Sequence, residues 1–209
     1  MAEGIQMIKF EHTMKRLIHF LIICGLVFTG ACQSKQQSPV APEEKTIGEI
    51  FAEAYEKGDW TTVVAIGDSL IGESDTMNLA IAYAEGLAAT GNTNKALSVL
   101  DKKIASNPQD YYLYQTKGNV YVTIEQYDSA LICYDKAIEI KPTNARAYIN
   151  EGAIYELKGN KEKAIENYLA ATYLFLRNKY YDEAKEFGNR VLSIDPNNAD
   201  AKEMLNQIP

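Results

Sequence analysis

Apolar residues recur at helical spacing along most of the chain from about residue 46 onward. The two clearest sets that share one helix face are Ala130, Tyr134, Ala137 and Ile138, and Ala164, Ile165, Tyr168 and Ala171. Because residues three and four positions apart lie on one face of an α-helix, this spacing predicts amphipathic helices of about 12 to 16 residues. No window alternates convincingly between apolar and polar residues, so the pattern predicts helices and no sheet.

Short turn signals separate these predicted helices. They are Gly58-Asp59, Gly91-Asn92, Asn107-Pro108, the segment 141–144, Gly159-Asn160 and the segment 195–198. Glycine just beyond one helix and proline shortly beyond the next are common ways for helices to end. The pattern therefore indicates helices that are joined in pairs by short connections.

The sequence also repeats itself at a fixed interval. The repeated pairs are Pro108 and Pro142, Tyr114 and Tyr148, Gly118 and Gly152, Tyr121 and Tyr155, Ala130 and Ala164, and Tyr134 and Tyr168. In this interval and in these residues the chain resembles the tetratricopeptide-repeat (TPR) family, whose unit is two antiparallel helices. The resemblance covers roughly residues 44–207 and is strongest over 111–171. It implies an all-α, TPR-type α-solenoid of stacked antiparallel helix hairpins.

The residue types at these positions have a physical reason. Gly118 and Ala130 are small, so the two helices of one hairpin can approach closely, while Tyr121 and Tyr134 fill the space beside them. One hairpin cannot bury its apolar face alone, so the units must stack. We expect units at about 44–76, 77–110, 111–144 and 145–178, then a shortened unit at about 165–198 and a capping helix at 199–207.

The segment 1–31 runs from basic to apolar to small residues and leads to a cysteine. Met14-Lys15-Arg16 is the basic start, and the segment 17–28 is an uncharged, mostly apolar run. A helix that spans a bilayer needs about 20 apolar residues, so this shorter run fits a cleaved signal peptide better than an uncleaved anchor, the alternative. The segment 29–32 resembles the lipobox of bacterial lipoproteins, in which Cys32 is the lipid attachment site. Thr29 departs from that pattern, since the family usually has an aliphatic residue there.

A polar segment follows at residues 33–45, QSKQQSPVAPEEK. It cannot bury enough apolar area to offset the entropy of ordering, so we expect a flexible tether. The predicted organisation is a signal peptide at 1–31, a lipid-anchored linker at 32–45 and a TPR domain at 46–209.

Glu3 and Glu11 precede the basic pair, which is unusual for a signal, so Met14 is the expected start.

Charge and composition exclude several classes of function. The segment 1–31 holds three of the 21 basic and two of the 28 acidic residues, so the processed chain has a net charge of −8 and no histidine. Scattered basic residues on an acidic chain argue against nucleic acid. The processed chain lacks histidine, a glycine-rich phosphate loop and a nucleophile motif. We therefore expect that it is not an enzyme and that it uses no metal, cofactor or small-molecule substrate. Cys133 is predicted to be a buried, inert side chain.

Candidate binding residues come from the resemblance, because the first helices of TPR hairpins line a concave face where many members bind peptides. The matching positions are Tyr112, Gln115, Asn119, Thr123, Arg146, Ile149, Asn150, Ala153 and Glu156. Asn119 and Asn150 are the sharpest candidates, since an amide both donates and accepts hydrogen bonds. Gln115 stands where relatives that grip a carboxylate have Lys, which argues against that function. The alternative is that these residues are merely solvated.

The predicted function is therefore a membrane-anchored, non-catalytic module that binds a protein or peptide through its concave face. The alternative is a permanent structural subunit of a cell-envelope machine for pilus or outer-membrane-protein assembly. Gln33 follows the expected lipid-bearing Cys32 where an Asp would retain the protein at the inner membrane. The expected location is thus the outer membrane, with the domain facing the periplasm.

Overall fold

The computed structural model describes residues 45–70 and 77–209 of the chain. The predicted signal peptide, the lipid attachment at Cys32 and the tether up to residue 44 lie outside the described residues. Within the two described ranges there are helices and no strands. None of these helices combines the length and the apolar content that crossing a bilayer requires.

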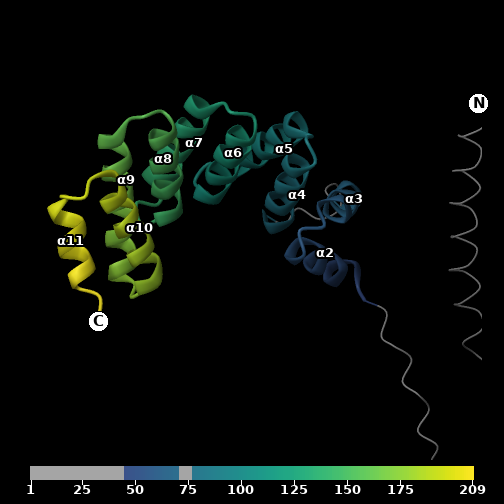
Figure 1. Cartoon of the computed structure of the whole chain (residues 1–209). Helices are drawn as coiled ribbons and strands as arrows, with labels where there is room; N and C mark the ends of the chain where they lie inside the picture. The colour runs from purple at the N-terminus through teal and green to yellow at the C-terminus, as the bar shows by residue number, and fades with distance from the viewer. Residues whose placement is uncertain (1–44, 71–76) are drawn as a thin grey trace, which may run out of the picture. The chain divides into compact units, whose positions relative to one another are not determined.

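Residues 45–209 form one compact unit of helices, and Figure 1 shows its hairpins following one another in a row. In chain order the helices are α2 (Ile47–Glu56), α3 (Trp60–Leu70), α4 (Met77–Ala89), α5 (Thr93–Ser106), α6 (Tyr111–Thr123), α7 (Tyr127–Ile140), α8 (Ala145–Leu157), α9 (Lys161–Arg177), α10 (Tyr181–Ile194) and α11 (Ala199–Asn206). Each helix packs mainly against its neighbours in sequence. The all-α stack of helix pairs predicted from the sequence is confirmed.

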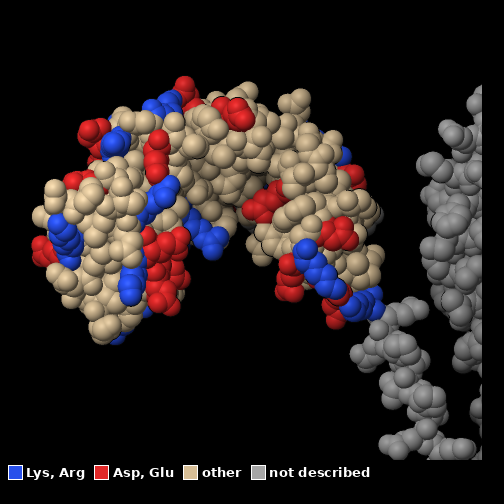
Figure 2. All heavy atoms as spheres, in the orientation of Figure 1, with Lys and Arg blue, Asp and Glu red and all other residues tan. Residues whose placement is uncertain are grey.

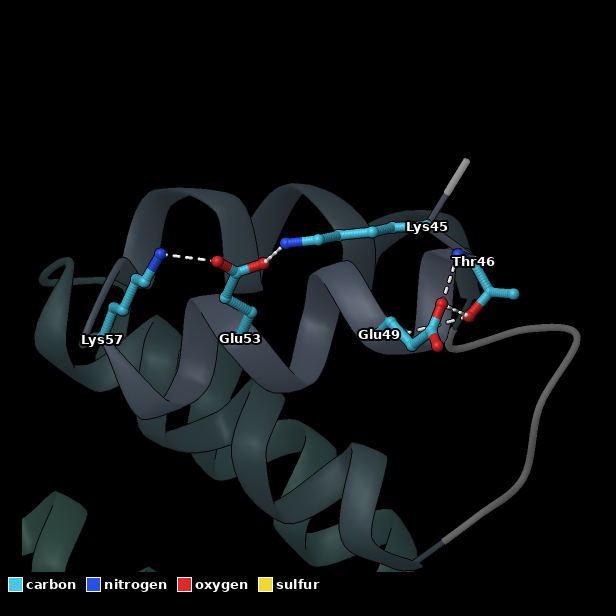
Figure 3. A network of polar contacts seen from close by, with 5 residues as sticks. All are labelled: Lys45, Thr46, Glu49, Glu53 and Lys57. Atoms are coloured by element: carbon cyan, nitrogen blue, oxygen red, sulfur yellow. Dashed lines mark hydrogen bonds and ion pairs between the residues drawn. The ribbon is translucent and has the colours of Figure 1, made fainter. Parts of the chain in front are cut away.

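The first described helix, α2, begins with a capping box (Figure 3). Thr46 Oγ1 accepts a hydrogen bond from the Glu49 backbone N–H at 3.2 Å, and Glu49 Oε2 accepts one from the Thr46 backbone N–H at 2.7 Å. Two backbone donors that have no partner within the helix are thereby satisfied. Glu53 pairs with Lys45 and Lys57, and these two contacts lower the pKa of its carboxyl to about 2. Thr46 and Glu49 therefore fix the start of α2.

Close contact between the two helices of a hairpin depends on glycine. A Cβ added to Gly118 would lie 2.5 Å from the ring of Tyr134, and one added to Gly152 would lie 2.8 Å from the ring of Tyr168. No side chain fits at such distances unless the ring moves. The structure thus confirms that a small residue at position 118 lets α6 and α7 approach.

The core is a series of small clusters, one after another along the stack. The first joins α4, α5 and α6 around Tyr83, Leu87 and Leu100. The second joins α6, α7 and α8 around Tyr134, and the third joins α9, α10 and α11 around Tyr168. Because each cluster links only neighbouring helices, the stability of the domain comes from the joints between successive hairpins.

Helix α9 is longer than its neighbours and packs along both α8 and α10. Phe187 of α10 stacks on Phe175, with ring centroids 5.9 Å apart, and on Tyr168, with centroids 6.0 Å apart. One helix thus serves two hairpins.

Along the face that Figure 2 shows, Lys and Arg alternate with Asp and Glu and form no continuous basic stripe.

Candidate functional site

An open groove of about 780 Å³, which we name the first-helix groove, is lined mainly by α2, α4 and α6, the first helices of the first three hairpins, and also by Leu70 at the end of α3. Its lining residues are Gly48, Phe51, Ala52, Tyr55, Leu70, Asn78, Leu79, Ile81, Ala82, Asp110, Tyr111 and Tyr112. Most of these side chains are aliphatic or aromatic, and Asn78 and Asp110 are the polar members. Grooves of this size with a few polar groups are typical of binding sites. Its chemistry suits an apolar side chain.

Two tyrosines border the groove, one on α2 and one on α6. The exposed fractions of Tyr55 and Tyr112 are 38% and 41%. The Tyr55 hydroxyl donates a hydrogen bond to Glu85 of α4, which, with burial, raises the pKa of Tyr55 to about 12. The positive charge of Arg146 on α8 acts in the opposite direction and lowers this pKa. The groove therefore has an aromatic border on both α2 and α6.

Four of the predicted binding residues remain accessible to a partner. Tyr112 lines the first-helix groove, and Arg146 of α8 is exposed. Ala153 is exposed and Ile149 is half-buried on α8, the next first helix. Their part in binding stays a prediction, and of the predicted residues only Tyr112 lines the groove.

Three other predicted binding residues make hydrogen bonds within the domain. Gln115 is 5% exposed, and its Oε1 accepts a hydrogen bond from Asn144 Nδ2 at 2.8 Å. Asn119 Oδ1 accepts from the Tyr134 hydroxyl at 2.8 Å and from Asn150 Nδ2 at 3.0 Å. These bonds tie α6 to α7 and α8. The two asparagines predicted to hold a peptide therefore also join successive first helices.

Thr123 and Glu156, the last two of the predicted set, are likewise bonded inside the domain. Thr123 Oγ1 donates to the Val120 carbonyl oxygen at 2.7 Å, within α6. Glu156 Oε1 accepts a hydrogen bond from Arg190 Nη2 at 2.7 Å, and its Oε2 accepts from Arg190 Nε at 3.0 Å. The Tyr168 hydroxyl also donates to Glu156 Oε2, at 3.0 Å. A two-pronged contact with arginine fixes geometry as well as charge, so Glu156 links α8 to α9 and α10.

Sequence reasoning missed most of the first-helix groove, because it lies in the two degenerate units. A signal was nevertheless present. The positions one repeat before Tyr112 and Gln115 are Asn78 and Ile81, and both of these residues line the groove. Phe51 of α2 has no such guide, because the unit before residue 77 matches the repeat only weakly.

Cys133 has the environment that the sequence predicted. Its side chain is 7% exposed, it forms no disulfide, and burial raises the pKa of the thiol to about 11. A thiol that stays protonated is a poor nucleophile. Cys133 therefore acts as a small apolar residue of α7.

Comparisons with known proteins identify the repeat. A TPR repeat model matches residues 118–159, and a tetratricopeptide repeat model matches residues 145–178 and 173–198. The chain is 30% identical over 125 residues to the uncharacterized protein ycf37 of Cyanophora paradoxa, covering 60% of this chain and 69% of that protein. The chain belongs to the tetratricopeptide-repeat family. Membership in the TPR family implies protein partners.

Two further relatives define how far the likeness extends. The TPR chain is 29% identical over 116 residues to the STIP1 homolog of Dictyostelium discoideum, but it spans only 21% of that protein. Among solved structures, MamA of Desulfovibrio magneticus RS-1 superposes with a TM-score of 0.56 at 22% identity, covering 77% of this chain and 88% of that one. This second likeness shows that the two chains share the TPR fold.

Proposed function

We propose that this TPR domain binds a protein partner by taking an apolar side chain of that partner into the first-helix groove. The observation that carries the proposal is the groove itself, an open apolar hollow lined mainly by the first helices of three successive hairpins. Exposed apolar surface of this kind on a domain marks a site of interaction. The border tyrosines, Tyr55 and Tyr112, add rigid contact area at a small entropic cost.

The size of the expected effect follows from the area that such a side chain buries. Moving one Leu-sized side chain from water into the groove contributes about 1.5 to 3 kcal/mol. That free energy corresponds to roughly 10- to 150-fold in affinity. An apolar anchor is therefore sufficient to distinguish a partner segment that carries it from one that does not.

Selection of peptides on the full chain, in mild detergent, tests this function. A phage-displayed library of random peptides should yield binders that carry an apolar residue. Ala52→Glu places a carboxylate on the groove wall and should weaken those binders by about tenfold or more, because a charge facing an apolar ligand loses its hydration. Ala65→Glu is the matched control, since Ala65 is also exposed but lies on α3 outside the groove. Equal affinity for both variants would contradict the proposal.

We also propose that the domain is held at the outer membrane, facing the periplasm, by a lipid on Cys32. The support is the order of basic, apolar and small residues before that cysteine, with a polar tether after it. Mass spectrometry of the mature protein should find Cys32 as the N-terminal residue, carrying two or three acyl chains. A mature chain that keeps residues 14–31 and an unmodified Cys32 would contradict the anchor.

A further inference from the structure

Two successive joints of the stack carry equivalent residues, and one charge is reversed between them. Where α6 packs on α5, Lys117 Nζ lies 2.5 Å from Asp101 Oδ1, and the Lys117 side chain is only 19% exposed. One repeat later along the chain, Glu151 stands at the position of Lys117 and Asp135 at that of Asp101. The second joint therefore keeps the aspartate and lacks the cation.

Glu151 is a buried carboxyl group that has one oxygen atom without a partner. The residue is 6% exposed, and its Oε1 has no hydrogen-bond partner in the part of the chain that the structure describes. A buried charge is costly unless it is paired, and an unpaired polar atom in a native interior calls for an explanation. The missing partner must be able to donate hydrogen bonds.

Glu151 faces a hollow of about 280 Å³ between α7, α8 and α9, which we name the acidic hollow. The charged residues that line it with Glu151 are Asp135 of α7 and Lys163 and Glu166 of α9. Lys163 Nζ already contacts Tyr155 in two ways. It donates a hydrogen bond to the Tyr155 hydroxyl at 3.3 Å, and it lies over the Tyr155 ring, 4.8 Å from the ring centroid. Three carboxyl groups thus share the acidic hollow with one ammonium.

Burial, followed by the nearby charge of Asp135 and a hydrogen bond with the Asp135 carboxyl group, raises the pKa of Glu151 to about 8. Glu166 raises this pKa further, while Lys163 lowers it. The ionised carboxylate is thus disfavoured, because it is buried and lies near other carboxyl groups. An additional cation in the acidic hollow would relieve this imbalance.

We propose that the acidic hollow binds a lysine or arginine side chain of a protein partner, in the place that Lys117 takes beside Asp101. A side chain fits better than an inorganic ion, because no three potential metal ligands converge among the described residues. The aliphatic stem of such a residue can pack on Ile138 and Ala170 at the wall, while its head reaches Glu151 and Asp135. The inference rests on the proposed protein-binding function. It uses α7 to α9, whereas the first-helix groove uses α2, α4 and α6.

Methyl NMR of the full chain in mild detergent, labelled at its alanine methyl groups, tests the two sites separately. Ala170 lines the acidic hollow and Ala52 lines the first-helix groove. N-acetyl-arginine amide is the probe, and N-acetyl-citrulline amide is its neutral, nearly isosteric control. We expect a saturable shift of the Ala170 methyl signal with the arginine probe alone, no saturable shift of the Ala52 signal, and loss of the response in Glu151→Gln.

Several results would overturn the proposal. They are the absence of a saturable shift, an equal response to the citrulline probe, and a response that survives in Glu151→Gln. A further such result is saturation of the Ala170 shift by magnesium chloride or calcium chloride at a lower concentration than the arginine probe requires. That result would assign the acidic hollow to an inorganic cation instead. Failure of the peptide-binding function would appear separately, as peptides that are insensitive to Ala52→Glu.

Stability measurements on two variants report on the same carboxyl without a ligand. The folded-state pKa of Glu151 lies above its ordinary value, so the wild-type chain should lose stability as pH rises from about 5 to 8. Glu151→Gln should remove that slope. Glu151→Lys should raise the melting temperature by forming with Asp135 the pair that Lys117 forms with Asp101. A pH slope that is unchanged in Glu151→Gln would show that Glu151 is not the strained group and would overturn its role.

Discussion

Replacing Tyr134 with alanine should lower the free energy of unfolding by about 3 to 5 kcal/mol, the usual cost of removing a buried aromatic ring. Tyr134 is 1% exposed, its ring covers Gly118, and its hydroxyl donates to Asn119 across the α6–α7 hairpin. The variant therefore loses packing and a hydrogen bond at once. Denaturant unfolding of the full chain, followed by circular dichroism, measures the loss as a lower midpoint.

Tyr180→Ala is the control for that measurement. Tyr180 is 57% exposed and makes an edge contact with Phe175, with ring centroids 6.4 Å apart. Its replacement should change stability by less than about 1 kcal/mol, as exposed substitutions usually do. If both variants unfolded at the same denaturant concentration, the joint between α6 and α7 would not have the packing described above.

Replacing Tyr112 with alanine should weaken binding of the selected peptides by about 30-fold, which is the effect of losing a contact of about 2 kcal/mol. Tyr112 is an exposed aromatic residue on the border of an apolar groove, and tyrosine is among the residues that most often dominate binding energy. Because its ring is 41% exposed, the unfolding midpoint should stay near that of the wild type. Isothermal titration calorimetry with one selected peptide gives both affinities.

The comparison variant is again Tyr180→Ala, since Tyr180 lies outside the first-helix groove. It should bind the same peptide with wild-type affinity. An equal loss of affinity in both variants would point to a general effect of removing a tyrosine rather than to a site at the groove.

The fold could be predicted from the sequence because its spacing is imposed by packing. Glycine and tyrosine at positions 118 and 134 recur one repeat later, at 152 and 168, and both pairs make the same close contact. A contact that leaves no room for a side chain at the glycine produces a pattern that a single sequence reveals. Helices with weaker constraints, such as α2, matched the repeat poorly.

The site was harder to predict, because polar residues at equivalent positions have different partners. Asn119 and Asn150 stood at positions suited to a peptide, yet they hydrogen-bond to each other. Glu166 has no sequence feature that sets it apart from the other helix carboxylates, yet it lines the acidic hollow with Glu151. These outcomes depend on which side chains lie opposite each other where two helices pack. The spacing of residues along one sequence does not reveal these partners.

Photo-crosslinking in cells of the native host tests most directly whether the first-helix groove holds a partner. The photoreactive residue p-benzoyl-phenylalanine would replace Ala52 on the groove wall or, separately, Ala65 on α3 outside it. We predict a protein adduct from position 52 that fades when Tyr112→Ala is added, and none from position 65. Equal adducts from both positions, or no adduct from position 52, would contradict the account.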